Sequence, residues 1–181
     1  MPPLEGVRDA CPPRAMPPQP PNPPQPQASN NMPPAVQTAS MATLRMAPRM
    51  GAEPVTLKVK PGEQRVWNII GMDLEGLNTD SLVLHYDSSA MDVSEVVFGG
   101  AMKIDPRTPP VATINRDTGT IKIVSSDGKP LQFLSGGDVI GLRLRGGKSG
   151  ETSLVIEPPE LRDTAGTNVM TAVTGGRAQV E

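Results

Sequence analysis

Short runs of alternating apolar and polar residues fill the chain from Val55 to its end. Ten runs have the length of a β-strand, and they lie at residues 55–60, 65–74, 81–87, 91–98, 111–116, 119–126, 138–145, 152–157, 168–173 and 177–180. The segments between them are rich in Gly, Asp, Ser and Pro, as in "SDGKP" and "GGKSGE". No unbroken helical spacing of apolar residues competes with this pattern. Alternation with a period of two, broken by turn residues, predicts an all-β domain over residues 55–181.

The same alternation indicates how the strands pack. In "GTIKIVSS", Ile121 and Ile123 point to one side of the strand, while Thr120 and Lys122 point to the other. Strands with one apolar and one polar face are typical of two packed sheets. We therefore expect a two-layer antiparallel β-sandwich of jelly-roll type with nine or ten strands. Because aromatic residues are few, we expect its core to consist of Val, Ile, Leu and Met.

The stretch that begins at Leu82 reads "LVLHYDSSAMDV" and combines a strand with a turn. Leu82, Leu84 and Tyr86 are expected to face the core, and their odd-numbered neighbours are expected to face out. Asp87 follows at the strand end, where a short acceptor can bind nearby backbone N–H groups and form a turn. Met91 then returns to the core. Tyr86 is expected to bury its ring while its hydroxyl reaches a polar partner at the rim of the sandwich.

The first part of the chain has a different composition. Fifteen of the 22 prolines precede Val55, and residues 12–34 have a proline at nearly every second position. Such a segment cannot bury enough apolar surface to order itself, so residues 1–54 are interpreted as a disordered Pro-rich tail and linker, in part a polyproline II spacer. A "PxxP" ligand for an SH3-like domain is an alternative for this tail. Residues 35–54 are read as linker, with docking of one piece on the domain as the alternative.

Charge and targeting signals narrow the classes of function. The formal net charge is -2, and no basic block suggests a nucleic-acid partner. No run is long and apolar enough for a membrane span, and no apolar region of a signal peptide is seen. Taken literally, this predicts a cytoplasmic protein; a piece of a longer exported protein would instead be extracellular or in the cell envelope. The lone Cys11 excludes an intrachain disulfide.

Catalytic and metal motifs are weak in this sequence. There is one histidine, His85, and neither a zinc-binding motif nor "GxSxG". The "GGKSG" segment lacks the strand and helix that flank a phosphate-binding loop. Calcium is an alternative at the loops of Asp117, Asp127 and Asp163, but each offers only one or two side chains where six to eight oxygens are needed. We therefore predict a non-enzymatic protein without a cofactor.

Several stretches together resemble a cohesin domain, the β-sandwich module that binds dockerin domains. Cohesins typically show an alternating strand ending in Tyr-Asp-Pro and then apolar residues two positions apart, as in "LVLHYDSSAMDV", where Ser88 replaces the proline. The opening of the family is matched by "VTLKVKPGEQRVWNIIGMDLEGL", and its later course by "GGDVIGLRLRGGKSGETSLVIEPPELRDTAGTNV". The resemblance covers residues 55–181 and implies a module that binds a protein partner.

A narrower resemblance concerns the setting of the domain. A cohesin-like domain after a Pro-rich linker is similar to the C-terminal end of some secretin-like proteins of type II secretion or type IV pilus systems, and "VATINRDTGTIKIVSS" is close to those versions.

One departure from the cohesin pattern bears on the identity of the partner. Cellulosomal cohesins tend to carry Asn and Asp at outward positions that here correspond to Thr79 and Ser81, so pairing with a cellulosomal dockerin is in doubt.

The predicted contact surface is the outward face of two strands. Its candidate partner-binding residues are Thr79, Ser81, Val83, His85, Thr120 and Lys122. A protein partner, dockerin-like or a secretion or envelope component, is the leading hypothesis. One alternative is a carbohydrate-binding module for polysaccharide, which would need an aromatic platform from Trp67 or Tyr86. The other is a purely structural accessory domain.

Overall fold

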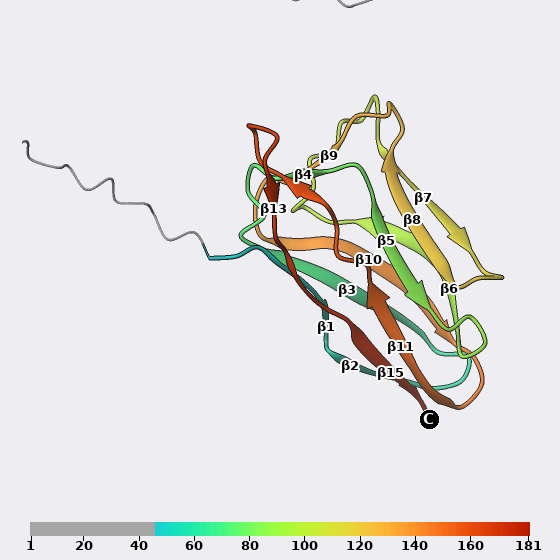
Figure 1. Cartoon of the computed structure of the whole chain (residues 1–181). Coiled ribbons are helices and arrows are strands. Elements are labelled where there is room, and N and C mark those ends of the chain that lie inside the picture. The colour runs from blue at the N-terminus through green and yellow to red at the C-terminus, as the bar shows by residue number, and fades with distance from the viewer. Residues whose placement is uncertain (1–45) are drawn as a thin grey trace, which may run out of the picture. The chain divides into compact units, whose positions relative to one another are not determined.

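The computed structural model describes residues 46–181, and Figure 1 shows that they form two layers of strands. The predictions for Cys11, for the "PxxP" motif and for a disordered tail lie in residues 1–45, outside the described part. Within residues 46–181 every regular element is a β-strand. This confirms the all-β sandwich. No helix capable of crossing a membrane occurs in this part of the chain.

One layer is a five-stranded sheet. Its strands, in spatial order, are β14 (Ala172–Thr174), β1 (Arg49–Glu53), β3 (Gln64–Met72), β10 (Gly137–Gly146) and β6 (Met91–Phe98). β3 and β10 form its centre through an antiparallel pairing from Gly71↔Gly137 to Gln64↔Arg145, with a register shift between Asp138 and Ile140. This shift lets the adjacent Val139 and Ile140 both enter the core.

The other layer is a six-stranded sheet. Its strands, in spatial order, are β2 (Thr56–Val59), β15 (Gly176–Val180), β11 (Gly150–Ile156), β5 (Leu82–Tyr86), β8 (Thr120–Ser125) and β7 (Pro110–Asn115). A small third sheet closes one end of the sandwich. It consists of β13 (Asn168–Val169), β12 (Leu161–Arg162), β4 (Asn78–Thr79) and β9 (Leu131–Gln132).

Two details of the predicted architecture are corrected. The structure has fifteen strands in its described part where nine or ten were expected; most of the added ones are only two or three residues long, too short to show alternation. The sandwich is also not purely antiparallel, because β1 pairs with β14, and β2 with β15, in parallel. Both parallel pairs join the start of the described chain to its end.

The predicted linker ends earlier than expected. Residues 49–53, assigned from sequence to the linker, form β1, which pairs with β3 over five registered positions. The alternative of a docked piece is therefore confirmed for this segment. Met50 and Ala52 are buried, so β1 contributes to the core. The chain then crosses to the other sheet at Pro54, where the carbonyl oxygen accepts a hydrogen bond of 2.7 Å from Trp67 Nε1.

The core is mainly aliphatic, as predicted. Its fully buried side chains include Ile69, Leu84, Ile121 and Leu142. Three aromatic residues, Trp67, Tyr86 and Phe133, are also buried, and Trp67 has 0 % of its surface exposed. Trp67 therefore does not form a platform for a sugar, because the indole faces inward between the two sheets.

The strand-and-turn reading of residues 82–93 is confirmed in all but one respect. Leu82, Leu84 and Tyr86 are buried, and Met91 returns to the core. Asp87 accepts hydrogen bonds from the Ser89 backbone N–H (2.9 Å) and hydroxyl (2.6 Å), and these bonds form the turn. The Tyr86 hydroxyl, however, has no direct hydrogen-bond partner within residues 46–181. Burial raises the pKa of this phenol, and the Asp92 carboxylate adds to the rise.

Candidate functional site

The outer face of the six-stranded sheet, called here the β5–β8 face, brings together five of the six predicted contact residues. In the antiparallel β5–β8 pair, Val83 lies opposite Lys122 and His85 lies opposite Thr120. Lys122 is exposed, and Ser81, Val83, His85 and Thr120 are partly exposed. Cross-strand neighbours on one face of a sheet touch each other, so these side chains form one continuous surface.

Thr79 does not belong to this surface. The threonine lies on β4 in the small third sheet and is only 2 % exposed. Its hydroxyl donates a 3.0 Å hydrogen bond to the Ser81 carbonyl oxygen. The prediction of Thr79 as a contact residue is wrong. The strand is interrupted at Asp80, so the alternation of outward and inward residues in β5 does not continue to Thr79. Thr79 instead holds the entrance of β5 in place.

Two neighbouring strands widen the face beyond what was predicted. β7 adds Val111 and Thr113, which lie opposite Val124 and Lys122 of β8. β11 adds Val155, which lies opposite His85 and is 50 % exposed. The alternation in "TSLVIE" does place Val155 outward. The sequence does not show that β11 pairs with β5, because about seventy residues separate the two strands.

A polar network crosses the centre of this face. His85 Nε2 lies 2.5 Å from Glu157 Oε1, and His85 Nδ1 lies 3.3 Å from Thr120 Oγ1. Thr118 donates a further 3.1 Å hydrogen bond to Thr120 Oγ1. The imidazole is thereby fixed between two strands beside Val83 and Val155. A fixed polar group between exposed valines suits a protein interface, which combines apolar contacts with oriented hydrogen bonds.

The Thr120, His85 and Glu157 side chains have the order of a nucleophile, a base and an acid, but their setting does not fit hydrolysis. All three stand on the open surface of a sheet. β5 and β8 both have neighbours on each side, so their backbone N–H groups are used in the ladder and cannot stabilise an oxyanion. The geometry therefore favours binding over catalysis.

An acidic groove of about 360 Å³ borders the face where β5 begins. Asp80, Glu157 and Glu160 line it together with Pro158 and Pro159. Arg162 lies against two of these carboxylates, 3.3 Å from Asp80 and 3.5 Å from Glu160. The ion pairs tie the loop after β11 to the start of β5. They define the shape of this end of the face.

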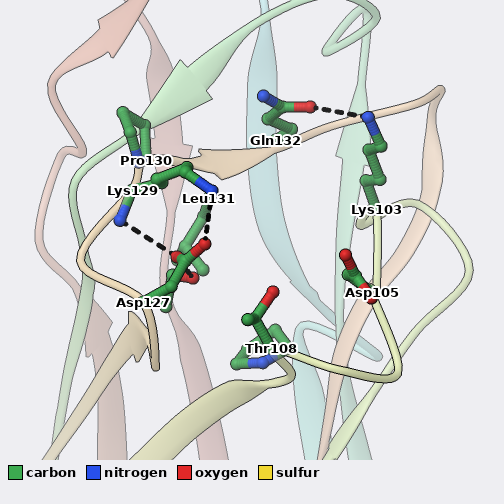
Figure 2. A pocket seen from close by; sticks show the side chains of 10 residues that line it. Lys103, Asp105, Thr108, Asp127, Lys129, Pro130, Leu131 and Gln132 are labelled. Carbon is green, nitrogen blue, oxygen red and sulfur yellow. Dashed lines mark hydrogen bonds and ion pairs between the residues drawn. The ribbon is translucent and has the colours of Figure 1, made fainter.

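A second pocket, of about 180 Å³, lies where β7 begins and β8 ends, beside β9 (Figure 2). Asp127 points to Lys129 on one side of it, while Lys103 and Asp105 line the other. Asp127 accepts hydrogen bonds from the Ser125 hydroxyl (2.6 Å) and from the Lys129 ammonium (2.9 Å). Both oxygens of the carboxylate are thus already bound by donors.

This arrangement bears on the calcium alternative. Asp127 is occupied as described, and Asp163 Oδ1 accepts two backbone N–H groups of its own turn. Asp117 follows Asn115, whose side chain forms the turn. Within residues 46–181, no three metal-ligating side chains gather in one place. The acidic loops are accounted for by turn formation.

The Asp127 network should make stability depend on pH. Hydrogen bonds from Ser125 and then Lys129 hold the pKa of Asp127 well below its usual 3.8. A lowered folded-state pKa stabilises the fold above pH 3.8, and this contribution is lost as the pH falls below that value. Asp127→Asn should therefore unfold at lower urea concentration than the wild type at neutral pH, and the difference should shrink in acid. An equal difference at both pH values would contradict this.

Comparisons with known proteins bear on the fold. No protein-family model matches the chain, and none of the curated proteins does. Solved structures do match. The cohesin of a Coh-OlpC-Doc435 complex from Clostridium thermocellum is 18 % identical over 75 % of this chain and 94 % of its own, with a TM-score of 0.63.

Two further structures agree. The sixth cohesin of scaffoldin B from Acetivibrio cellulolyticus, in complex with a Cel5 dockerin, is 16 % identical over 75 % of this chain and all of its own, with a TM-score of 0.62. A non-cellulosomal cohesin from the archaeon Archaeoglobus fulgidus is 14 % identical over 75 % of this chain and 92 % of its own, with a TM-score of 0.59. The sandwich of this chain is thus a cohesin-like domain in its fold.

Proposed function

We propose that this chain is a non-catalytic scaffolding module that binds a protein partner of the dockerin kind through the β5–β8 face. One observation carries the proposal. The strand ladder of a cohesin-like sandwich sets Val83, His85, Lys122 and Val155 side by side on one open face. Several of the similar solved structures are complexes of a cohesin with a dockerin, which supports a partner of that kind here.

The chemistry of the face indicates what the partner must offer. Val83 and Val155 provide apolar contact, while the His85–Glu157 pair and Lys122 provide oriented polar groups. No aspartate or asparagine stands at the outward positions Ser81, Val83 and His85 before Tyr86, so on β5 itself the partner would meet hydrogen-bonding groups and an apolar side chain in place of a carboxylate. We propose a cell-envelope or secretion assembly outside the cytoplasm as its setting, on the strength of the likeness of "VATINRDTGTIKIVSS" to secretin-linked versions.

The carbohydrate alternative finds little support. Stacking of a sugar ring requires an exposed aromatic side chain. Trp67, Tyr86 and Phe133 are all buried, and Phe98 packs against the core. These are the four aromatic residues of the chain, and each lies within the described residues. A surface without an aromatic platform favours a protein ligand over a polysaccharide.

The test compares two valines of equal exposure on opposite sheets. Val155 on the β5–β8 face and Val66 on the five-stranded sheet are each 50 % exposed. The full chain is immobilised and probed with a panel of purified dockerin domains and with a polysaccharide array. We expect at least one dockerin to bind. Val155→Glu should weaken that binding by about a hundredfold, since an unpaired charge is then buried at the contact.

Val66→Glu is the matched control and should leave the affinity for a single dockerin domain unchanged, because Val66 lies on the opposite sheet. Both variants are surface substitutions, and thermal unfolding would confirm that each one folds. An equal loss of dockerin affinity in the two variants would show that the β5–β8 face is not the contact surface. Binding to polysaccharides alone would remove the proposal.

A further inference from the structure

The outer face of the five-stranded sheet, opposite to the β5–β8 face, carries exposed apolar side chains among its polar and charged ones. Val66 and Met72 of β3 and Val97 of β6 stand on it with 50 %, 51 % and 42 % of their surface exposed. Gly51 of β1 pairs with Ile70 of β3 and leaves that position of β1 without a side chain. Apolar side chains thus stand beside a floor without side chains, an arrangement open to a second surface.

A groove of about 470 Å³ follows β1 on this face. Gly51 forms its floor, Ile70 and Met72 form one wall, and Val55 and Thr174 complete it. Its lining exposes more apolar than polar surface. The exposed Met170 lies two residues before Ala172, which pairs with Arg49, and adds an adaptable apolar side chain near that end.

The charges of this groove are placed symmetrically. Arg49 and Glu53 stand two residues before and two residues after Gly51, so they point to the same face of the strand. Both are exposed, and neither forms an ion pair within residues 46–181. The groove therefore carries one positive and one negative end at equal distances from its glycine.

We propose that this face binds a second copy of the same chain in a two-fold symmetric dimer. Gly51 and Ile70 are paired across β1 and β3. A two-fold axis that lies between the two copies and runs parallel to the line from Gly51 to Ile70 would set each β1 antiparallel over the β1 of the other copy. Arg49 of each copy then meets Glu53 of the other, and Ile70 meets Ile70. Self-complementarity of this kind is what an isologous interface requires. A single partner of uniform charge would satisfy only one end of the groove.

The geometry limits where the contact is centred. Asp138 of β10 is paired with Ile70 and so lies on the same line across the sheet. If the two sheets lay flat against each other, the Asp138 carboxylates of the two copies would face each other. The contact is therefore centred on β1 and β3, since the twist of the sheet turns β10 away. The two β5–β8 faces then point in opposite directions. Such a dimer presents two separate partner-binding faces, which raises avidity toward a partner with repeated sites.

The first test is sedimentation equilibrium of the full chain under reducing conditions, so that Cys11 cannot link two copies. The wild type should dimerise with a dissociation constant of about micromolar or tighter. Glu53→Arg and Arg49→Glu should each weaken dimerisation by at least about tenfold, because like charges then face each other. The double reversal should restore the affinity to within about threefold. A wild type that stays monomeric at about 100 µM would overturn the proposal.

The second test examines the two-fold axis directly. In a Cys11→Ser background, Ile70→Cys places one thiol opposite its own copy, within reach of a short bismaleimide across two sheets packed about 10 Å apart. Cross-linked dimer is expected for Ile70→Cys and not for Lys122→Cys, which lies on the opposite sheet. Cross-linking of both cysteine variants or of neither would contradict this geometry. In the sedimentation test, single charge variants that dimerise as tightly as the wild type would also contradict it.

Discussion

Trp67→Ala should lower the free energy of unfolding by about 3–5 kcal/mol, the range measured for removal of a large aromatic side chain from a core. The indole is fully buried between β3 and β15, and a Cβ on Gly176 would lie only 2.2 Å from its Cζ2 atom. Gly176 therefore has no side chain to fill the space that the ring leaves. Urea unfolding followed by circular dichroism would measure the loss.

Two variants separate the causes of this loss. Trp67→Phe keeps most of the packing but removes the donor to the Pro54 carbonyl oxygen, so it should cost about 1–3 kcal/mol. Val66→Ala changes the adjacent outward residue on the same strand and should stay within about 0.5 kcal/mol of the wild type. Similar losses for Trp67→Ala and Val66→Ala would mean that the indole does not hold the two sheets together.

Gly119→Ala should be strongly destabilising, whereas Gly128→Ala should be mild, although both glycines have positive φ angles, of 63° and 74°. A left-handed conformation costs a residue with a Cβ about 1–2 kcal/mol at either position. At Gly119 the new Cβ would also lie 1.9 Å from the Tyr86 carbonyl oxygen, while at Gly128 it would meet nothing within 4 Å. The clash should add about 1–3 kcal/mol to the loss at Gly119.

The difference between the two glycine variants isolates the close approach of the β7–β8 turn to β5. The Tyr86 backbone N–H donates a 2.8 Å hydrogen bond to the Gly119 carbonyl oxygen, so a displaced turn also disturbs this bond. Thermal unfolding of both variants measures the difference. Equal losses would indicate that the turn moves aside freely. Reduced partner binding in a folded Gly119→Ala would further show that this bond positions His85 and Thr120.

The alternation of apolar residues was enough to predict which side chains of β5 and β8 face out. Leu82, Leu84 and Tyr86 are buried as expected, and Val83 and His85 are not. This success has a simple cause: in a sheet with one buried face, the pleat alone assigns each residue to a side. It places five of the six predicted contact residues on the outer face, while their contact with a partner stays a prediction.

The parts that were missed depend on contacts between distant segments. "RMGAE" shows no strand signal of its own, and β1 exists because β3 and β14 pair with it on both sides. Val155 joins the face only through the pairing of β11 with β5. Thr79 was misplaced because β4 belongs to a different sheet from β5. Local patterns do not encode these pairings, since they are determined by the packing of the whole sandwich.

The two parallel strand pairs determine how the sandwich bears a mechanical load. A pull applied at the start of β2 and at the end of β15 acts along this parallel pair, whose four registered positions run in the same direction. Such a pull loads these positions together in shear and cannot open them one after another. Lys58 and Glu181 add an ion pair of 2.9 Å at the same place. A domain under tension between its first and last strands resists unfolding better when these strands are paired in this way.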